Sequence, residues 1–329
     1  MKILVTGGAG YIGGAVATEL LRCGYDVIVL DNFSRGHRAA VPRKATLIHA
    51  DIGDQAVLRR LFTTSQIDGV MHLAASIEVG ESMLAPSSYF RNNTVNTLNL
   101  LELMREYGIT KFVFSSTAGI YSAPCQVPIR ESLLLKPASP YGESKLMVEQ
   151  MLLWFNRLHG LRYASLRYFN AAGALDEHGE DHRPESHLIP LVLQAASGHT
   201  KSVYIYGTDY ETPDGTCVRD YIHISDLAHA HVLAFQKLGT EDEPERLIYN
   251  LGNSRGYSVR EVIDVAQRVT GRKICCREMP RRPGDPPVLI ASSEQIMRDL
   301  GWKPKVTELE AIIQSAWQWR QKNPDGYTS

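Results

Sequence analysis

Cysteines are few in this sequence, net charge is almost absent and no long hydrophobic run occurs. The five cysteines are odd in number and include no C-x-x-C pair, which argues against a disulfide framework or a zinc knuckle and favours a reducing cytoplasm. The 35 Lys and Arg residues balance 36 Asp and Glu residues, so no overall field attracts nucleic acid or an anionic membrane. The longest charge-free stretch, residues 112–129, contains Ser, Thr, Gln and Pro and is too polar to span a membrane.

The remaining composition is that of a globular protein. The chain has 329 residues, of which 44% are hydrophobic and 22% charged, enough for about two domains. Short β-branched runs alternate with segments of helical periodicity, a pattern that predicts a doubly wound parallel sheet, the Rossmann class of α/β fold. We expect strands over Lys2–Thr6, Tyr25–Asp31, Thr46–Ala50, Gly69–Ala74, Lys111–Ser116 and Tyr163–Tyr168, and helices over Tyr11–Cys23, Asp54–Thr64, Pro86–Tyr107 and Pro140–His159.

The alternation becomes irregular after residue 170. A polar loop over residues 173–186 follows, and a proline-rich stretch covers residues 280–287. We therefore expect a Rossmann domain over residues 1–170 and a smaller lobe over residues 171–329. Later segments, such as residues 225–262, are expected to pack back onto the first domain.

A glycine-rich loop joins the first strand to the first helix. Gly7, Gly10 and Gly13 stand where backbone N–H groups and a helix N-terminus can close on a pyrophosphate, although a turn that needs positive φ would use glycine too. Asp31 ends the second strand about 20 residues later, the spacing of a carboxylate for the adenosine ribose, which favours NAD over NADP. Asp51 has two interpretations, a helix cap or a partner for the adenine amino group.

Tyr141 and Lys145 are four residues apart at the start of a predicted helix and so share one face. An ammonium near a phenol lowers the phenol pKa and makes it a general base. Thr117 ends the fifth strand, at the edge where parallel sheets bind ligands, although an ordinary turn is an alternative interpretation. Tyr107 and Lys111 repeat the spacing, but Gly108 between them should end the helix, so we treat this pair as a decoy.

With these motifs, the chain resembles the extended short-chain dehydrogenase/reductase family, and within it the UDP-galactose (UDP-glucose) 4-epimerases. The resemblance runs nearly from end to end. The further blocks that carry it are Val79-Gly-Glu-Ser82, Asn92-Asn93, Ser139-Pro-Tyr-Gly142, Leu166-Arg-Tyr-Phe-Asn170, Val218-Arg-Asp-Tyr-Ile-His223, Asp226-Leu-Ala228, Tyr249-Asn-Leu-Gly252 and Arg282-Pro-Gly-Asp285. The resemblance implies a homodimeric enzyme with NAD as bound cofactor that epimerises a UDP-hexose through a transient 4-keto sugar.

The resemblance also implies residue roles. Thr117 would hold the sugar 4-oxygen, Tyr141 would be the acid/base, and Lys145 would bond the nicotinamide ribose. The cofactor residues would be Gly7, Gly10, Tyr11, Ile12, Gly13, Asp31, Asn32, Asp51, Ile52, Asn92, Tyr141, Lys145 and Phe169. The substrate residues would be Thr117, Asn170, His187, Leu188, Tyr206, Arg219, Arg282, Asp285 and Leu289. Two arginines suit a diphosphate, although a structural ion pair with Asp220 is the alternative interpretation of Arg219.

Several positions depart from the family pattern. Ile77 replaces a cofactor-contacting Lys of many relatives, which puts NAD retention in question; His187 replaces an Asn, and Thr117 a Ser, with the hydroxyl retained. At the position of Leu289 relatives carry either Tyr or a small residue, and a small residue makes room for an N-acetyl group. We therefore expect UDP-galactose and UDP-glucose to be the best substrates.

Other functions fit the same motifs less well. A nucleotide-sugar 4,6-dehydratase needs Asp-Glu after the Thr, where this chain has Ala118-Gly119. A regulatory NAD-sensing protein would have lost Tyr141 or Lys145. Epimerases of UDP-N-acetylhexosamines, UDP-pentoses or UDP-uronates remain alternatives. Two His/acid sets resemble metal ligands but lack H-E-x-x-H spacing, so we predict no metal. These sets are Asp220, His223, Asp226, His229 and His231, and His178, Glu180 and His182.

Overall fold

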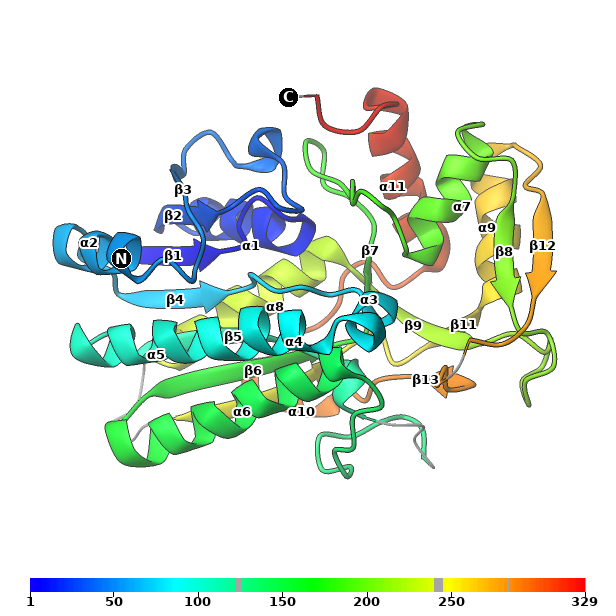
Figure 1. Ribbon diagram of the computed structural model, residues 1–329. Coiled ribbons are helices and arrows are strands. Elements are labelled where there is room, and N and C mark those ends of the chain that lie inside the picture. Colours follow the sequence, from blue (N-terminus) through cyan, green and yellow to red (C-terminus); the bar gives the residue numbers. More distant parts are fainter. Residues whose placement is uncertain (122–125, 240–244, 283, 329) are drawn as a thin grey trace.

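A seven-stranded parallel sheet forms the centre of the computed structural model, which describes residues 1–121, 126–239, 245–282 and 284–328 (Figure 1). The strand order is β10-β6-β5-β4-β1-β2-β3. The strands are β1 (Lys2–Thr6), β2 (Asp26–Asp31), β3 (Thr46–His49), β4 (Gly69–His72), β5 (Lys111–Thr117), β6 (Arg162–Tyr168) and β10 (Arg246–Leu251). The predicted doubly wound α/β fold is confirmed.

Helices cover both faces of this sheet because its strands are apolar on both sides. Successive residues of β1 enter opposite cores: Ile3 and Val5 face one, and Leu4 faces the other. One core is covered by α1 (Tyr11–Arg22), α8 (Ile224–Lys237) and α10 (Glu294–Leu300). The other core is covered by α2 (Gln55–Thr64), α5 (Asn96–Glu106) and α6 (Pro140–His159).

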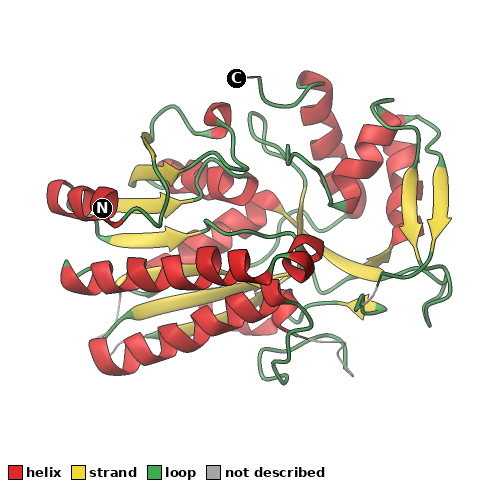
Figure 2. Ribbon diagram, viewed as in Figure 1, coloured by secondary structure: helices red, strands yellow, loops and turns green. Residues whose placement is uncertain are grey.

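A second group of elements lies at the carboxyl ends of the strands (Figure 2). Its sheet contains β7 (Asn170–Ala172), β9 (Val218–His223), β11 (Gly256–Ser258) and β13 (Val288–Leu289). A two-stranded sheet pairs β8 (Val203–Tyr206) with β12 (Cys276–Met279), and α7 (Leu188–Ala196), α9 (Val259–Thr270) and α11 (Leu309–Lys322) share an apolar core. Among the described residues, no helix is both long and apolar enough to cross a membrane.

One predicted helix differs from the structure, and one short helix was not predicted. The helix expected over residues 86–107 is divided into α4 (Pro86–Tyr89), a π-helical segment η2 (Phe90–Val95) and α5. Within η2 the buried Asn93 side chain bonds the backbone of Ser76 and the hydroxyl of Ser144, so the irregular turn carries a specific polar contact. A short helix, α3 (Val79–Leu84), precedes it and was not predicted.

Candidate active site

The glycine-rich loop is built for close backbone approach. Gly7 has a φ of +71°, and a Cβ there would lie 2.5 Å from the backbone nitrogen of Ala74, just beyond the end of β4. A Cβ at Gly13 would collide with the carbonyl of Gly7. A Cβ at Gly10 would approach the Gly7 carbonyl oxygen at 3.3 Å and no other described atom within 4 Å. The loop is therefore tight on its inner side and open at the start of α1.

The N-terminus of α1 fits a phosphate group. Gly10 caps the helix without a side-chain hydrogen bond, and the first turn contains no acidic residue, so its N–H groups and dipole are free of an internal anion. The hydroxyl of Tyr11 donates to the Gly173 carbonyl at 2.7 Å, and the Tyr11 carbonyl oxygen lies 2.5 Å from the His178 Nε2 atom. Ile12 and Gly13 follow Tyr11 in the first turn of α1. These features fit the pyrophosphate of a dinucleotide.

Asp31 lies directly beside this loop. Its carboxylate accepts the N–H of Ala9 at 2.9 Å and that of Phe33 at 2.8 Å. Burial raises the pKa of Asp31 above its ordinary value, and the two backbone donors partly offset the shift. The carboxylate is thus held at the end of β2, where the sequence predicts a ribose acceptor.

Asp51 is not a helix cap. Asp54 caps α2 by accepting the N–H groups of Ala56 and Val57, whereas Asp51 accepts the amide of Asn32 at 2.6 Å and the N–H of Gly53 at 2.7 Å. One of the two interpretations of Asp51 is therefore excluded. Ile52 beside it is buried in the core.

Three consecutive hydroxyls at the end of β5 have three different partners. The Ser115 hydroxyl contacts the hydroxyl of Tyr168, and the Ser116 hydroxyl donates to Glu149 at 2.6 Å. The Thr117 oxygen accepts the N–H of Gly119 at 3.0 Å, as in an ordinary turn, and also hydrogen-bonds Tyr141. Thr117 can therefore both close an ordinary turn and serve the site. Of the three hydroxyls, that of Thr117 is the one that contacts Tyr141.

The start of α6 places Tyr141 against this strand. Ser139 caps the helix by accepting the N–H of Gly142 at 3.2 Å, and Pro140 occupies the first turn. A Cβ on Gly142 would collide with the carbonyl oxygen of Gly119, so only glycine permits this approach. Close packing of α6 on the turn η3 (Ala118–Ile120) thus brings Tyr141 to Thr117.

The pKa of Tyr141 is raised, not lowered as the sequence argument predicted. Burial raises the Tyr141 pKa more than the hydrogen bond with Thr117 lowers it, and the charge of Glu78 raises it further. The Lys145 ammonium donates to the Ser115 carbonyl at 2.8 Å, and burial lowers the pKa of Lys145 to about 7. Lys145 is thus held by the end of β5 in this structure rather than bonded to the phenol.

Sequence reasoning did not identify the buried network under this site. Glu149 of α6 accepts the Ser116 hydroxyl and two nitrogens of Arg167 of β6, and the third Arg167 nitrogen, Nη1, donates to the Tyr121 hydroxyl at 2.8 Å. Tyr121 in turn donates to Asn250 of β10 at 2.9 Å. The network ties α6 to four segments, and no local sequence pattern marks Glu149 because its partners are distant in the chain.

The remaining predicted cofactor residues, Asn92 and Phe169, have neighbours from different parts of the chain. The Asn92 amide donates to Ser76 at 3.2 Å, and Phe169 packs against a small apolar cluster together with Leu289. Leu289 of β13 is in register with Arg219 of β9. A position predicted for the cofactor and one predicted for the sugar therefore share one cluster.

The second sheet gathers the predicted substrate residues. The Asn170 amide donates to the Asp220 carbonyl at 2.8 Å, which fixes β7 beside β9. Arg219 forms an ion pair with Asp285 at 3.2 Å, not with Asp220, whose buried carboxylate accepts three backbone N–H groups. The structural Arg219–Asp220 pair considered from the sequence is thus absent from the described structure.

Two further members of the predicted set contact each other. The Arg282 guanidinium lies 3.9 Å from the centroid of the Tyr206 ring, although Tyr206 ends β8 and Arg282 follows β12. Residue 283 of the same block lies outside the described residues. The two side chains bring an aromatic face and a cation together on one surface, which suits a nucleotide.

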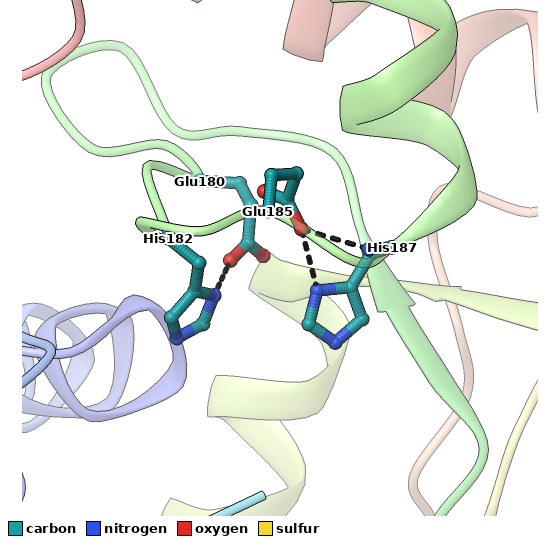
Figure 3. Close-up of side chains that lie close together, drawn as sticks. All are labelled: Glu180, His182, Glu185 and His187. Carbon is teal, nitrogen blue, oxygen red and sulfur yellow. Dashed lines mark hydrogen bonds and ion pairs between the residues drawn. The ribbon is translucent and has the colours of Figure 1, made fainter. Parts of the chain in front are cut away.

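His187 and Leu188 stand at the start of α7. The His187 Nδ1 atom lies 2.8 Å from a Glu185 oxygen (Figure 3). Burial alone would lower the pKa of His187, but the hydrogen bond with Glu185 and the charges of Glu180, Glu185 and Glu78 raise it to about 9. Leu188 packs on the core of the second region.

The second Tyr/Lys pair is separated in space. Tyr107 is the C-cap of α5 and its hydroxyl lies 3.0 Å from the Thr63 hydroxyl. Gly108 has a φ of +69°, and Lys111 starts β5 and lies 5.8 Å from the Phe235 ring centroid. The expectation that these two side chains do not share a face is confirmed.

Comparison with known proteins agrees with this geometry. Residues 3–252 match the NAD dependent epimerase/dehydratase family. The chain is 50% identical to a UDP-glucose 4-epimerase of Halalkalibacterium halodurans over 100% of this chain and 98% of the relative. A crystal structure of a UDP-glucose 4-epimerase superposes with a TM-score of 0.96 at 46% identity, with full coverage of both chains. The enzyme of Bifidobacterium longum in complex with NAD+ and UDP gives 0.94 at 38%, covering 99% of this chain and 100% of that one.

Proposed function

The chain belongs to the NAD dependent epimerase/dehydratase family, and on that premise we propose that it interconverts UDP-galactose and UDP-glucose by epimerisation at C4. It is an NAD-dependent enzyme of UDP-hexoses, an isomerase. The observation that carries the proposal is the hydrogen bond between Tyr141 and Thr117 at the carboxyl end of a parallel sheet, where the fold binds its ligands.

The catalytic roles follow from that pair. Tyr141 removes the proton of the sugar 4-hydroxyl and returns it when the carbon is reduced. Thr117 donates a hydrogen bond to the 4-oxygen and so positions it for Tyr141. NAD, when bound, supplies the reversible hydride acceptor that this oxidation and reduction require. The buried ammonium of Lys145 donates to the Ser115 carbonyl at the end of β5. We propose that it also bonds the nicotinamide ribose.

The phenol pKa gives the cofactor a further role. Burial and the charge of Glu78 together raise the pKa of Tyr141 more than the hydrogen bond with Thr117 lowers it. A positive nicotinamide ring and a Lys145 ammonium drawn towards the ribose would both favour the phenolate. We infer that NAD binding lowers the pKa of Tyr141 and so makes it a more effective base.

The UDP-sugar is proposed to occupy the second region of the molecule. Arg219 and Arg282 supply cations for the diphosphate, Tyr206 an aromatic face for uracil and Asp285 an acceptor for ribose hydroxyls. Asn170, His187, Leu188 and Leu289 complete the pocket. In this division residues 1–170 hold NAD, and most of residues 171–329 hold the sugar nucleotide. Two later elements belong with the first part, because α8 packs on α1 and β10 extends the first sheet.

Two finer features of the proposal concern assembly and location. The enzyme is proposed to act as a homodimer through α5 and α6, and in a reducing cytoplasm, as the free cysteines among the described residues favour. Epimerases of other UDP-sugars share every step of the mechanism, so the pocket around Leu289 decides between substrates.

Product analysis tests the function. The purified protein, supplied with NAD, is incubated separately with UDP-galactose, UDP-N-acetylgalactosamine, UDP-xylose and UDP-glucuronate, and the products are resolved by chromatography. We expect rapid conversion of UDP-galactose to UDP-glucose and slow conversion of the others. No conversion of any of them, with NAD bound, would overturn the proposal.

A further inference from the structure

One loop carries a cluster of side chains that the epimerisation mechanism does not use as a unit. Between β7 and α7, Glu180, His182, Glu185 and His187 fall within eight residues, and one ligand atom from each lies within 4.8 Å of all the others. Figure 3 shows the four side chains turned towards one another from two adjoining stretches of the loop. The imidazole rings of His182 and His187 have centroids 5.5 Å apart.

The carboxylates of this cluster are shielded from water. The Glu185 side chain is 4% exposed and that of Glu180 is 10% exposed, while His182 is 14% exposed and His187, which is also proposed to line the sugar pocket, is 44% exposed. Each carboxylate meets an imidazole: Glu180 contacts His182, and Glu185 contacts His187. Glu185 also accepts the N–H groups of Ser186 and His187 at 2.8 Å, so three donors already compensate its charge, whereas Glu180 meets the imidazole of His182. A shielded carboxylate is costly unless a cation or several donors compensate it, and carboxylates flanked by nitrogen donors are typical of a metal centre.

We propose that Glu180, His182, Glu185 and His187 bind one zinc ion, which fastens this loop. Two imidazole nitrogens with two carboxylate oxygens form a donor set that zinc accepts and that calcium and magnesium, which prefer oxygen alone, do not favour. With bonds of about 2.0–2.2 Å, tetrahedral donors lie roughly 3.3–3.6 Å apart. The widest pair, within 4.8 Å, would have to close in by about an ångström, whereas Glu180 and His182, and likewise Glu185 and His187 at 2.8 Å, would have to separate to admit the ion.

All four zinc positions are filled by protein, which makes the site structural rather than catalytic. The loop it would fasten reaches both regions of the molecule. His178 contacts the Tyr11 carbonyl at the start of α1, the Tyr327 N–H donates to Asp181 at 2.9 Å, and His187 is the N-cap of α7. Zinc would therefore hold the loop between the glycine-rich loop and the first turn of α7. The sequence predicted no metal because the E-x-H-x-x-E-x-H spacing belongs to a loop and not to a helix face.

Zinc binding can be measured without substrate or NAD, so its outcome is independent of the proposed function. The protein is freed of metal with a chelator and equilibrated with Zn²⁺ alone, and bound metal is counted by mass spectrometry. We expect one zinc ion per chain and a melting temperature that rises with zinc. Millimolar Mg²⁺ should not displace it.

Variants locate the ion. His182→Gln and Glu185→Gln should each weaken zinc binding by about 100-fold or more, since loss of even an outer partner costs about 10–100-fold. His229→Gln is the matched control: His229 also pairs with a carboxylate, Glu19, at 3.3 Å, and lies outside the loop. The metal-free melting temperature of each variant checks its fold, and two variants at different positions guard against one that does not fold. Two results would overturn the proposal. One is less than one zinc ion per chain at micromolar free Zn²⁺, and the other is wild-type affinity for zinc in a folded His182→Gln or Glu185→Gln variant.

Discussion

The phenol of Tyr141 is the group on which turnover should depend most strongly. Tyr141→Phe removes the proton acceptor but leaves Arg219 and Arg282 to bind the diphosphate, so we expect kcat to fall by about 10²–10⁴-fold with little change in the affinity for UDP. A coupled assay for UDP-glucose formation gives kcat, and calorimetry gives the Kd for UDP.

Tyr107 supplies the control for this experiment because it heads the same Tyr-x-x-x-Lys spacing. Its hydroxyl contacts the exposed Thr63 of α2 and not the proposed base. Tyr107→Phe should keep wild-type turnover. If Tyr141→Phe behaved like Tyr107→Phe, Tyr141 would not be the acid/base.

Leu289 should set the size of sugar that the pocket accepts. It packs against the cluster that contains Phe169, and Leu is branched and offers no hydrogen bond to an amide. Bulk of this kind discriminates by about 1–3 kcal/mol, so we expect weak turnover of UDP-N-acetylgalactosamine and an increase in Leu289→Ser. The ratio of kcat/KM values for the two sugars measures this. A ratio that already favours the N-acetyl sugar in the unchanged protein would contradict it.

Single residues were predictable where their partners are local or fixed by strand ends. Thr117 and Tyr141 were candidates because a strand end and a helix start meet at one edge of a parallel sheet, and their roles came from the resemblance to the epimerases. The Lys145 contact was not predictable, because its acceptor is a backbone carbonyl whose position depends on how α6 packs on β5. The low pKa of Lys145 likewise follows from burial, which no spacing reveals.

At the scale of elements, the contact between α6 and η3 should control catalysis. Gly142→Ala places a Cβ against the Gly119 carbonyl, so the helix must move away from the turn and take Tyr141 from Thr117. A displacement of about 1 Å at a reacting pair can cost about 10²-fold, and we expect kcat to fall by that order while the sheet remains folded. Circular dichroism and kcat measured on the same sample distinguish these effects.

Gly80 is the matched control for that substitution. It lies in the short helix α3, and a Cβ added to it would meet no described atom within 4 Å, so Gly80→Ala should leave kcat unchanged. Wild-type kcat in Gly142→Ala would show that the close approach of α6 to η3 is unimportant for Tyr141.

Helix and strand positions in the first half of the chain were predictable because their signals are local. Two elements occur with the predicted bounds, the strand Lys2–Thr6 and the helix Pro140–His159. A continuous apolar run predicted the strand, and a Ser-Pro start and a glycine at the end predicted the helix. The π-helical segment η2 was not predictable, since it depends on Asn93 reaching Ser76 and Ser144. Strand β10 was also missed, because its partner β6 lies far earlier in the chain.

For the whole molecule, the arrangement of the two sheets explains why distant residues form one site. Strand β10 and helix α8 return to the first sheet, so the second sheet, which contains β7 and β9, lies at the carboxyl ends of the strands, where Tyr141 and Thr117 meet. Any sugar nucleotide bound by Arg219 is therefore presented to the edge where NAD is proposed to bind.

The outer face of α5 and α6 gives a prediction about assembly. The sequence suggests Leu146 and Trp154 of α6 as candidates for a dimer face. Leu146 is instead buried in the chain's own cluster with Ile120, but Trp154 is 56% exposed and Leu158 is 67% exposed. Exposed apolar residues on a helix face are typical of a surface that a second copy covers, so we expect a dimer at micromolar concentration in sedimentation.

Trp154→Glu should shift the population to monomer, because association would desolvate the new charge. Leu134→Glu, which changes a similarly exposed apolar residue in a loop, should remain dimeric. A monomeric wild-type protein, or equal behaviour of the two variants, would show that α6 does not form the interface.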